Sequence, residues 1–365
     1  MAKRLILAGA GHAHLHSILN IPDFIRAGYS VTVVSAGDVH YYSGMGPGLL
    51  AGLYTPEQTR FAVKIMAENR GAEFIAGCVT RIDADQNRII LDDGRILDYD
   101  VLSCNLGSFV LPLTSGTSAV IPVKPIENLY TAGRSLEHHL KTKALSALVV
   151  GGGPAGVEIA GNLRGLAEHA GGRLDIALVS QSPLLERFAP RVRGIVSESF
   201  ARRNIRILEN ASISSFTETK AILSSGETIH FDTAFNATGI RPSGVFSDSG
   251  LLTGPDGGLL VNEYLQCLHY PNIFGAGDCI AFAPRRLDRV GVYAVRQGPI
   301  LYANLQACLS SAPLTAFEPQ HRHLSILNLG DGTGVAARGA FVYKGRLAFR
   351  LKDYIDRMFM RRFPN

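Results

Sequence analysis

The sequence has no tryptophan, and only five of its 365 residues are cysteines. No two of these have the C-x-x-C spacing of a zinc site or a redox pair. A pair of that kind is therefore excluded, and five reduced thiols favour a cytoplasmic protein. The cysteines are Cys78, Cys104, Cys267, Cys279 and Cys308.

Charged residues are also few, at 18% of the chain, where about 25% is usual. The longest uncharged stretch, residues 101–123, is long enough to cross a bilayer. It contains glycines and prolines, so we expect a strand, a loop and another strand instead of a transmembrane helix.

The net charge of +5 is concentrated at one end of the chain. Residues 344–365 hold seven basic and two acidic side chains, and the remaining residues hold 29 of each kind (36 − 7 and 31 − 2). A neutral body with a basic end does not have the basic groove of a nucleic-acid-binding domain. We therefore expect no nucleic acid partner.

Two segments of the chain share one plan of strand, glycine turn, helix and strand. In the first, strands at residues 3–8 and 30–35 enclose a helical pattern that runs to about Ala27. In the second, strands at residues 147–150 and 174–180 enclose a helical pattern to about Ala170. A hairpin and a closing strand follow each segment. Each segment is thus a βαβ unit of the kind that binds a dinucleotide.

The two glycine turns differ in completeness. Gly151, Gly153 and Gly156 make the full G-x-G-x-x-G pattern, whereas in the first turn His14 takes the place of the third glycine. Neither following strand ends in the acid that would bind a ribose, so the choice between NADH and NADPH stays open. It also stays open that the second unit keeps the dinucleotide fold but binds no nucleotide. His12 and His16 share a helix face, but no carboxylate or thiol lies near them, which favours nucleotide contact or packing over a metal.

Five motifs in the right order resemble the two-dinucleotide-binding-domain FAD flavoproteins of the pyridine nucleotide-disulfide oxidoreductase superfamily. Besides the two glycine turns, these are residues 102–108, 236–242 (Asn-Ala-Thr-Gly-Ile-Arg-Pro) and 272–278 (Asn-Ile-Phe-Gly-Ala-Gly-Asp). The type II NADH dehydrogenase-like branch is the closer match. Residues 42–48, 123–126, 297–305 and 351–360 also resemble the flavoprotein module that is fused to selenide, water dikinase.

The resemblance implies an α/β fold with two Rossmann-like domains, β-hairpin insertions and a small C-terminal domain that ends in an amphipathic helix. We expect an FAD-binding domain at 1–113 and 266–318. An NAD(P)-binding domain would occupy 114–265, and a C-terminal interface or membrane-association segment 319–365.

The same resemblance implies the residues that bind the two cofactors, FAD and NAD(P)H. Residues expected at the FAD are Gly9, Gly11, His12, Ser35, Tyr42, Ser43, Gly48, Val79, Gly107, Gly277 and Asp278. Those expected at the nicotinamide dinucleotide are Gly151, Gly153, Gly156 and Gly239. No metal ligands are expected.

Three residues are implied in catalysis, each with an alternative. Glu158 would face the flavin–nicotinamide site, or else be a plain carboxylate at a helix N-terminus. Lys124 would place a positive charge beside the flavin, or else be a surface lysine between domains. Gln297 would bind near the ring or the acceptor, or else be an ordinary polar residue of a helix.

The C-terminal residues 345–363 have the periodicity of a basic amphipathic helix, which suits an anionic membrane surface. Its apolar stripe comprises Leu347, Leu351, Tyr354, Ile355, Met358 and Phe359. Docking on the flavin domain or in a homodimer interface is the alternative. With a membrane surface, the protein would be peripheral on the inner face of the cell membrane.

The resulting functional hypothesis is an FAD-dependent oxidoreductase that passes a hydride from NAD(P)H to FAD and electrons on to a quinone-type acceptor. Two alternatives remain. One is a flavoprotein that oxidises a sulfur or selenium compound without nicotinamide. The other is a non-enzymatic flavin-binding interaction module.

Overall fold

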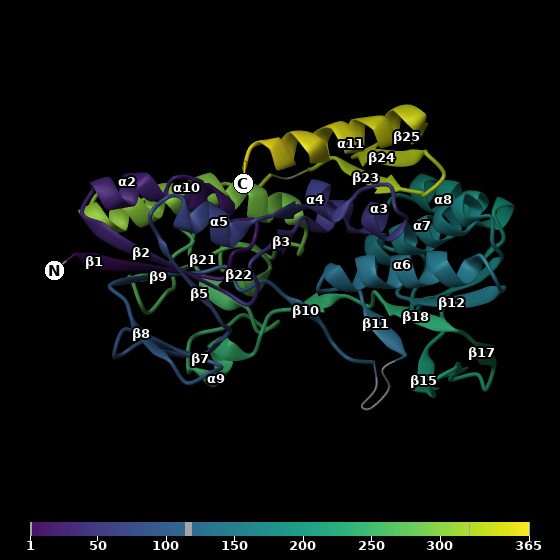
Figure 1. Cartoon of the computed structure of the whole chain (residues 1–365), viewed down its shortest axis with the longest axis horizontal. Helices are drawn as coiled ribbons and strands as arrows, with labels where there is room; N and C mark the ends of the chain where they lie inside the picture. The colour runs from purple at the N-terminus through teal and green to yellow at the C-terminus, as the bar shows by residue number, and fades with distance from the viewer. Residues whose placement is uncertain (1, 114–118, 321, 365) are drawn as a thin grey trace.

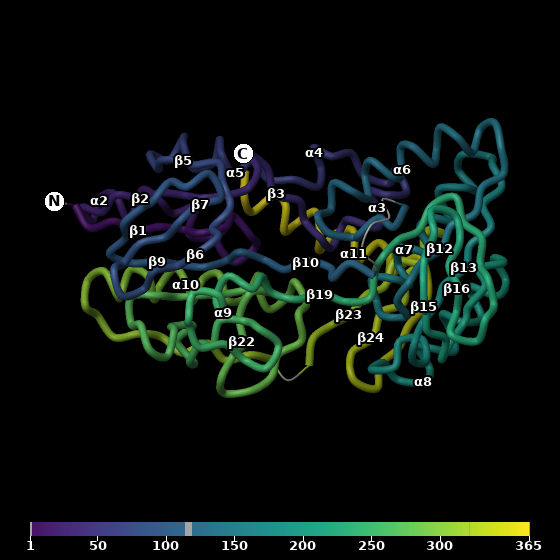
Figure 2. The backbone as a smooth tube through the Cα atoms, turned by 90° about the horizontal axis from the view of Figure 1, so that it is seen from below, coloured from purple at the N-terminus to yellow at the C-terminus, as the bar shows by residue number. Residues whose placement is uncertain are grey.

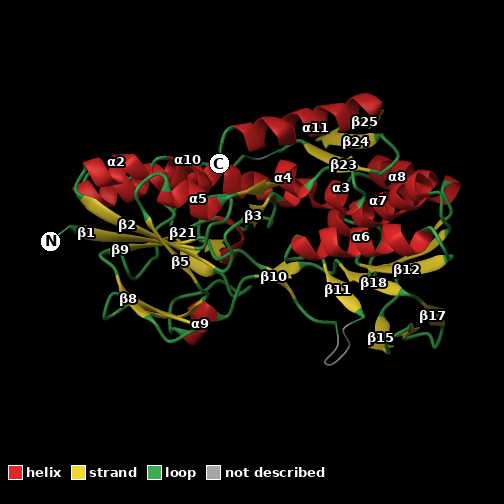
Figure 3. Cartoon of the chain, in the orientation of Figure 1, coloured by secondary structure: helices red, strands yellow, loops and turns green. Residues whose placement is uncertain are grey.

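The chain forms two α/β lobes side by side, with one long helix lying across them (Figure 1). The computed structural model describes residues 2–113, 119–320 and 322–364. Each lobe has a parallel sheet with helices against it, and a small antiparallel sheet at its rim (Figure 3). The predicted fold class is thereby confirmed.

The first lobe is built on a five-stranded parallel sheet in the order β21-β9-β1-β2-β5. Its strands are β1 (Lys3–Ala8), β2 (Tyr29–Ser35), β5 (Glu73–Ala76), β9 (Val101–Cys104) and β21 (Ile273–Gly275). The helices of this lobe are α1 (Leu15–Leu19), α2 (Ile21–Arg26), α5 (Val63–Glu68) and α10 (Gly291–Ser310). β1 and β9 are apolar along most of their length because both faces of the sheet are covered: helices lie on one face, and the β-strands of residues 79–98 lie on the other (Figure 3).

The first βαβ unit departs from the expected single helix. The helix is divided into α1 and α2 at Asn20, whose side-chain amide donates to the carbonyl of His16 at 2.8 Å. Pro22 follows two residues later, and proline removes a backbone donor from a helix interior. The prediction of one uninterrupted helix to about Ala27 is therefore wrong.

The second lobe repeats this plan with a parallel sheet in the order β11-β18-β12-β13-β14. Its strands are β11 (Val120–Pro122), β12 (Leu145–Val150), β13 (Leu174–Val179), β14 (Ile205–Leu208) and β18 (Thr233–Asn236). The helices are α6 (Glu127–Leu140), α7 (Pro154–Ala170) and α8 (Pro190–Arg202). α7 runs unbroken to Ala170 and ends on Gly171 in a left-handed conformation, as predicted.

In the structure, each predicted hairpin is part of a three-stranded antiparallel sheet. The first such sheet comprises β6 (Val79–Asp83), β7 (Arg88–Leu91) and β8 (Ile96–Asp98). The second comprises β15 (Ile213–Phe216), β16 (Lys220–Leu223) and β17 (Thr228–His230). Gly94 and Gly226 both have positive φ in the turn between the last two strands of their sheet.

Two of the chain's crossings between the lobes pair with each other. β10 (Phe109–Val110) and β19 (Ile240–Arg241) form a short antiparallel ladder in the middle of the molecule (Figure 2). The uncharged stretch 101–123 therefore contains β9, β10 and β11, while its residues 114–118 lie outside the described part. Among the described residues, no helix has both the length and the apolar character needed to cross a bilayer.

After the second crossing the chain rejoins the first lobe. This region contains α9 (Val245–Asp248), β20 (Leu259–Val261), the 3₁₀ helix η2 (Gly277–Cys279) and β22 (Ile280–Phe282). Val245, Phe246 and Leu251 pack in the same hydrophobic core as β1 and β9. Packing against the first lobe thus begins before residue 266, where we expect the FAD-binding domain to resume.

The loop after β2 contains several short elements. These are β3 (His40–Tyr41), η1 (Ser43–Met45), α3 (Gly46–Leu50), α4 (Pro56–Thr59) and β4 (Arg60–Phe61). Pro56 begins α4 after a capping box made by Thr55 and Gln58.

The C-terminal part forms a three-stranded antiparallel sheet and the long helix α11 (Arg346–Arg361). The strands are β23 (Ser325–Asn328), β24 (Gly334–Arg338) and β25 (Phe341–Gly345). This sheet is pressed onto α7, where a Cβ atom at Gly161 would lie 2.5 Å from the carbonyl oxygen of Leu329. At its other end α11 places Phe359 in the core of the first lobe. α11 therefore bridges the two lobes.

Candidate active site

Asn105 organises the first glycine turn, at the end of β9. A Cβ at Gly9 would lie 2.3 Å from the Asn105 carbonyl oxygen, and one at Gly11 would lie 2.4 Å from its side-chain Oδ1. That Oδ1 accepts the N–H of Ala13 at 3.1 Å, while Nδ2 donates to the Ala276 carbonyl at 2.7 Å. Glycine is needed at both positions so that turn and strand can meet, as in the pyrophosphate turn of a Rossmann fold.

His14, in place of the third glycine, is a packing residue. It is fully buried, and its Nε2 lies 2.7 Å from Oγ of Ser103 on β9. Burial lowers the pKa of His14 to about 4, so the imidazole is neutral near pH 7. The helix stays close to the sheet because a histidine hydrogen-bonded to the next strand fills the space.

His12 points to a different neighbour. Its Nδ1 lies 3.2 Å from Nε2 of His40, and its ring stacks on that of Phe359. His16 instead meets the edge of Tyr302. The two histidines of the shared helix face are thus not brought to one site, and the described residues contain no group of three metal-ligating side chains.

Asp278, Lys124 and Ser108 form a compact polar cluster between the lobes. The Lys124 ammonium donates to Oδ2 of Asp278 at 2.8 Å and to Oγ of Ser108 at 2.9 Å, and Ser108 donates to the same carboxylate at 3.0 Å. The Lys124 side chain is only 24% exposed. The alternative of a surface lysine therefore does not hold, although Lys124 does lie at the crossover between the lobes.

Gln297 supports the same cluster from α10. It is buried, and its Oε1 accepts the backbone N–H of Gly277 at 2.7 Å. Beside it a cavity of about 480 Å³ is lined by Gly277, Asp278 and Gln297, together with Arg241 and Tyr293. Gln297 thus holds the turn that carries Asp278.

The remaining residues predicted at the FAD lie at the end of β2, in η1, in α3 and at the start of β6. Ser35 ends β2, and its carbonyl accepts the N–H of Gly77, two residues before Val79 begins β6. Ser43 approaches the first residue of α10, since a Cβ at Gly291 would lie 3.9 Å from its Oγ. Gly48 makes room for the ring of Tyr54.

The second glycine turn repeats the geometry of the first. A Cβ at Gly151 would lie 2.3 Å from the carbonyl oxygen of Ala237, and one at Gly156 would lie 1.8 Å from that of Gly151. A Cβ at Gly153 would meet no atom within 4 Å, so this face of the turn is open toward a ligand. Gly107 and Gly239, after the last strand of each unit, are equally open and have positive φ.

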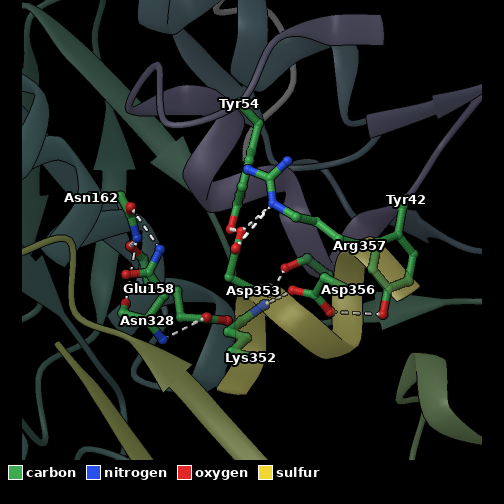
Figure 4. Close-up of polar contacts among 10 residues, drawn as sticks. Tyr42, Tyr54, Glu158, Asn162, Asn328, Lys352, Asp353, Asp356 and Arg357 are labelled. Carbon is green, nitrogen blue, oxygen red and sulfur yellow. Dashed lines mark hydrogen bonds and ion pairs between the residues drawn. The ribbon is translucent and has the colours of Figure 1, made fainter. Parts of the chain in front are cut away.

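Glu158 faces a group of side chains from α11 (Figure 4). Its Oε1 accepts the backbone N–H of Asn328 at 2.9 Å, and Asn328 in turn bonds Asn162 on α7 at 3.0 Å. Lys352 donates to Oδ2 of Asp356 at 2.7 Å and to the Gly44 carbonyl. Glu158 is therefore more than a plain carboxylate at a helix N-terminus.

Burial sets the acidity of this group. It raises the pKa of Glu158, against the attraction of Lys352, and likewise raises the pKa of Asp356. Burial disfavours the Lys352 ammonium, yet its pKa is raised because the attraction of Glu158 and Asp356 outweighs that cost. Tyr42 completes the group by donating to Oδ1 of Asp356 at 3.1 Å.

Sequence reasoning missed Asn105, Asn328, Lys352 and Asp356. The i, i+4 pair of Lys352 and Asp356 was a usable signal, because such a pair bonds along one helix face. The sequence analysis considered instead only the apolar stripe of this helix, as a membrane-binding or docking surface. In the structure that stripe faces outward: Leu347 is 64% exposed and Tyr354 61%, whereas the Asp356 side chain is 6% exposed. Of the predicted stripe, only Phe359 is buried.

The five cysteines are free thiols, in agreement with the absence of a redox pair. Cys104, Cys267 and Cys279 are buried, and burial raises the pKa of Cys279 to about 12. A thiol with that pKa is a poor nucleophile near pH 7.

Comparison with known proteins agrees with this geometry. The model of the family "Pyridine nucleotide-disulphide oxidoreductase" matches residues 3–298. A type II NADH:quinone oxidoreductase of Staphylococcus saprophyticus is 26% identical, over 97% of this chain and 94% of that protein.

Two solved structures share the fold. The sulfide:quinone oxidoreductase of Aquifex aeolicus superimposes with a TM-score of 0.82 at 18% identity, over 99% of this chain and 91% of that one. NDH2 of Plasmodium falciparum in complex with NADH has a TM-score of 0.81 at 14% identity, over 99% and 97%.

The family match spans most of the chain, and the glycine turns that it includes have the backbone approaches that dinucleotides need. The predictions of an enzyme and of FAD and NAD(P)H as its cofactors are confirmed. The chain belongs to the pyridine nucleotide-disulphide oxidoreductase family, as an FAD-dependent oxidoreductase of the NADH dehydrogenase type.

Proposed function

We propose that this protein oxidises NAD(P)H and passes the electrons through FAD to a quinone-type acceptor. The observation that carries the proposal is the largely buried group of Glu158, Lys352 and Asp356, where α7, residues 42–48 and α11 meet. FAD, when bound, takes a hydride from the nicotinamide and gives electrons to a second substrate. A quinone also needs protons, and groups with raised pKa values can supply them.

The FAD would lie in the first lobe, with its pyrophosphate at Gly9, Gly11 and His12. Ser35 and Val79 would lie near its ribose and adenine, and Asp278 would hold the ribityl chain. The close backbone approaches at Gly9 and Gly11 support this placement. Tyr42, Ser43, Gly48, Gly107 and Gly277 would line the remainder of the site.

The nicotinamide dinucleotide would lie on the second turn, at Gly151, Gly153 and Gly156, with Gly239 beside it. Glu158, one turn into α7, would face the junction of the two cofactors. Lys124 would place its positive charge at the edge of the flavin. Gln297 would hold the Gly277–Asp278 turn in position. The limits 1–113 and 266–318, 114–265 and 319–365 remain our proposed domain limits.

The outer face of α11 would bind an anionic membrane surface through residues 344–363. Its exposed apolar side chains continue onto β25, where Phe341 is 62% exposed. Arg346, Arg350 and Arg361 lie on the same helix. Such a face enters the lipid headgroup region, and its basic residues favour anionic lipids. The protein would then be peripheral at the inner face of the cell membrane, and a homodimer through this face is the alternative.

Two other functions remain as outcomes of the test. A flavoprotein that oxidises sulfur or selenium compounds would need no nicotinamide, and the buried free thiols give it little support. A non-enzymatic module would retain flavin without turnover. The closeness to the flavoprotein module of selenide, water dikinase stays a prediction.

An anaerobic titration distinguishes these functions. The purified protein should show a flavin spectrum that NADH or NADPH bleaches at once and that a soluble quinone restores. The nucleotide that bleaches it faster gives the preference. Bleaching by sulfide and by neither nucleotide would contradict the proposal, and a flavin that no donor bleaches would favour the interaction module.

A further inference from the structure

A half-buried carboxyl group, Glu158, and a buried one, Asp356, lie near a single ammonium group at the junction of α7 and α11. Lys352 donates to Asp356 at 2.7 Å, on the next turn of its own helix. The carboxylate of Glu158, from α7, points toward the same ammonium group (Figure 4). The side chains of Lys352 and Asp356 are 13% and 6% exposed. One positive charge thus serves two negative ones in a site that water barely reaches.

The two carboxyl groups, Asp356 and Glu158, accept different numbers of hydrogen bonds. Asp356 accepts hydrogen bonds on both oxygens, from Tyr42 at 3.1 Å and from Lys352 at 2.7 Å. The hydrogen bond described for Glu158 is the backbone N–H of Asn328 on one oxygen. Donors aimed at a carboxylate stabilise its ionised form, so the surroundings favour the ionised form more strongly at Asp356 than at Glu158.

The charged and titratable groups around the pair come from α7, from α11 and from the loop after β2. Glu158 of α7 faces Lys352 and Asp356 of α11. Tyr42 lies directly before η1. Asp353 of α11 also acts on Lys352 and Asp356, but it pairs with Arg357 at 2.9 Å and accepts from Tyr54. Asp353 is therefore a near neighbour with a partner of its own.

We propose that Asp356 is a positioning residue: it competes with Glu158 for the Lys352 ammonium and thereby determines how readily Glu158 holds a proton. Removal of the Asp356 charge both ends a repulsion and releases Lys352 toward Glu158. Removal of Lys352 has the opposite effect on Glu158. The competition between Asp356 and Glu158 does not depend on the proposed function. Only its effect on turnover rests on the proposed function.

The experiment is an infrared titration of protonated carboxyl groups against pH in the FAD-loaded protein, without substrate. The Glu158 band is assigned by its loss in Glu158→Gln. In Asp356→Asn its apparent pKa should fall by about one pH unit, the usual effect of one nearby charge. In Lys352→Met it should rise. The matched control, Asp353→Asn, should leave it unchanged.

An unchanged Glu158 band in folded Asp356→Asn would overturn the inference, as would a shift of equal size in Asp353→Asn. If Asp356→Asn does not fold, Lys352→Met decides, because a rise supports the competition and no rise contradicts it. The pH profile of quinone reduction should shift with the band. A band that shifts in a protein that cannot reduce quinone would refute the proposed function alone.

Discussion

The side-chain oxygen of Asn105 accepts a hydrogen bond from the backbone N–H of Ala13 at 3.1 Å. Asn105 ends the strand beside β1, and Ala13 lies in the glycine turn that follows β1. Because the other end of the same amide bonds the Ala276 carbonyl, one side chain joins three chain segments. The shape of the proposed FAD site therefore depends on this amide.

Asn105→Ala should lower both stability and FAD retention. The substitution leaves the Ala13 N–H and the Ala276 carbonyl without their partner, and each buried unsatisfied group costs about 1–3 kcal/mol. Urea unfolding and the ratio of flavin to protein after gel filtration measure the two effects. Full flavin content in Asn105→Ala would contradict this role.

Gly151→Ala should abolish reduction by the nicotinamide while the protein keeps FAD. The new methyl group would meet the Ala237 carbonyl at 2.3 Å, and φ at this position is +123°. The second turn must therefore shift, and we expect flavin reduction by NADH or NADPH to slow by more than about tenfold, which is 1.4 kcal/mol.

Dithionite reduction of the same variant tests whether the flavin itself is intact. Gly194→Ala, in α8, is the matched control, since a Cβ there meets no atom within 4 Å. It should reduce at the normal rate. A normal rate in Gly151→Ala as well would place the nicotinamide dinucleotide elsewhere.

His14 should make the protein acid-sensitive in a defined window. Its pKa is lowered by burial to about 4 in the folded state, against about 6.5 in an unfolded chain. Its contribution is therefore complete above pH 6.5 and is lost as the pH falls toward 4, by about 1.4 kcal/mol per pH unit. Below pH 4 the loss stops, because both states are protonated.

The measurement is the free energy of unfolding in urea at several pH values between 7 and 4.5. His14→Gln should be less stable at pH 7 and show a flatter dependence on pH than the unsubstituted protein. His169→Gln, at an exposed position, is the control and should keep the original slope. Equal slopes in all three proteins would mean that His14 titrates normally.

Leu347→Ser combined with Tyr354→Ser should abolish binding to anionic vesicles. Both side chains are more than 60% exposed on the outer face of α11, opposite the side that carries Lys352 and Asp356. Reduction of a water-soluble quinone should persist, because the inner face is unchanged. Sedimentation with vesicles of phosphatidylglycerol and phosphatidylcholine measures the binding.

Leu268→Ser is the control for loss of an exposed apolar side chain, since Leu268 is 46% exposed and lies far from α11 in sequence. It should bind vesicles normally. If the double variant also binds normally, the outer face has another role. A change in its mass in solution would then identify that role as self-association.

Much of the fold follows from local sequence. The strands beside each glycine turn are apolar because a parallel sheet is covered on both faces, and the glycines mark turns that other residues cannot make. The order of the motifs indicated the family for the same reason, since each motif solves a steric problem at a strand end. The break in the first helix at Asn20 was harder to predict, because it depends on only one side chain and one proline.

Less of the candidate site than of the fold could be predicted from the local sequence. Gly9, Gly11, Gly151 and Gly156 could be named because their function lies in the backbone of a single turn. Asn105 could not, since its importance comes from meeting two segments that are distant in sequence. The same holds for Asn328, whose backbone donor reaches Glu158 only after β23 packs on α7.

The C-terminal helix shows most clearly where sequence stops and tertiary structure begins. Its helical period, its basic charge and its apolar stripe are properties of consecutive residues, and they determined that an amphipathic helix forms. Which face turns inward was decided by the partners that the fold presents. Glu158, Gly44 and Tyr42 offer a negative charge, a carbonyl and a hydroxyl, so the Lys352–Asp356 face is buried and the apolar stripe is left outside.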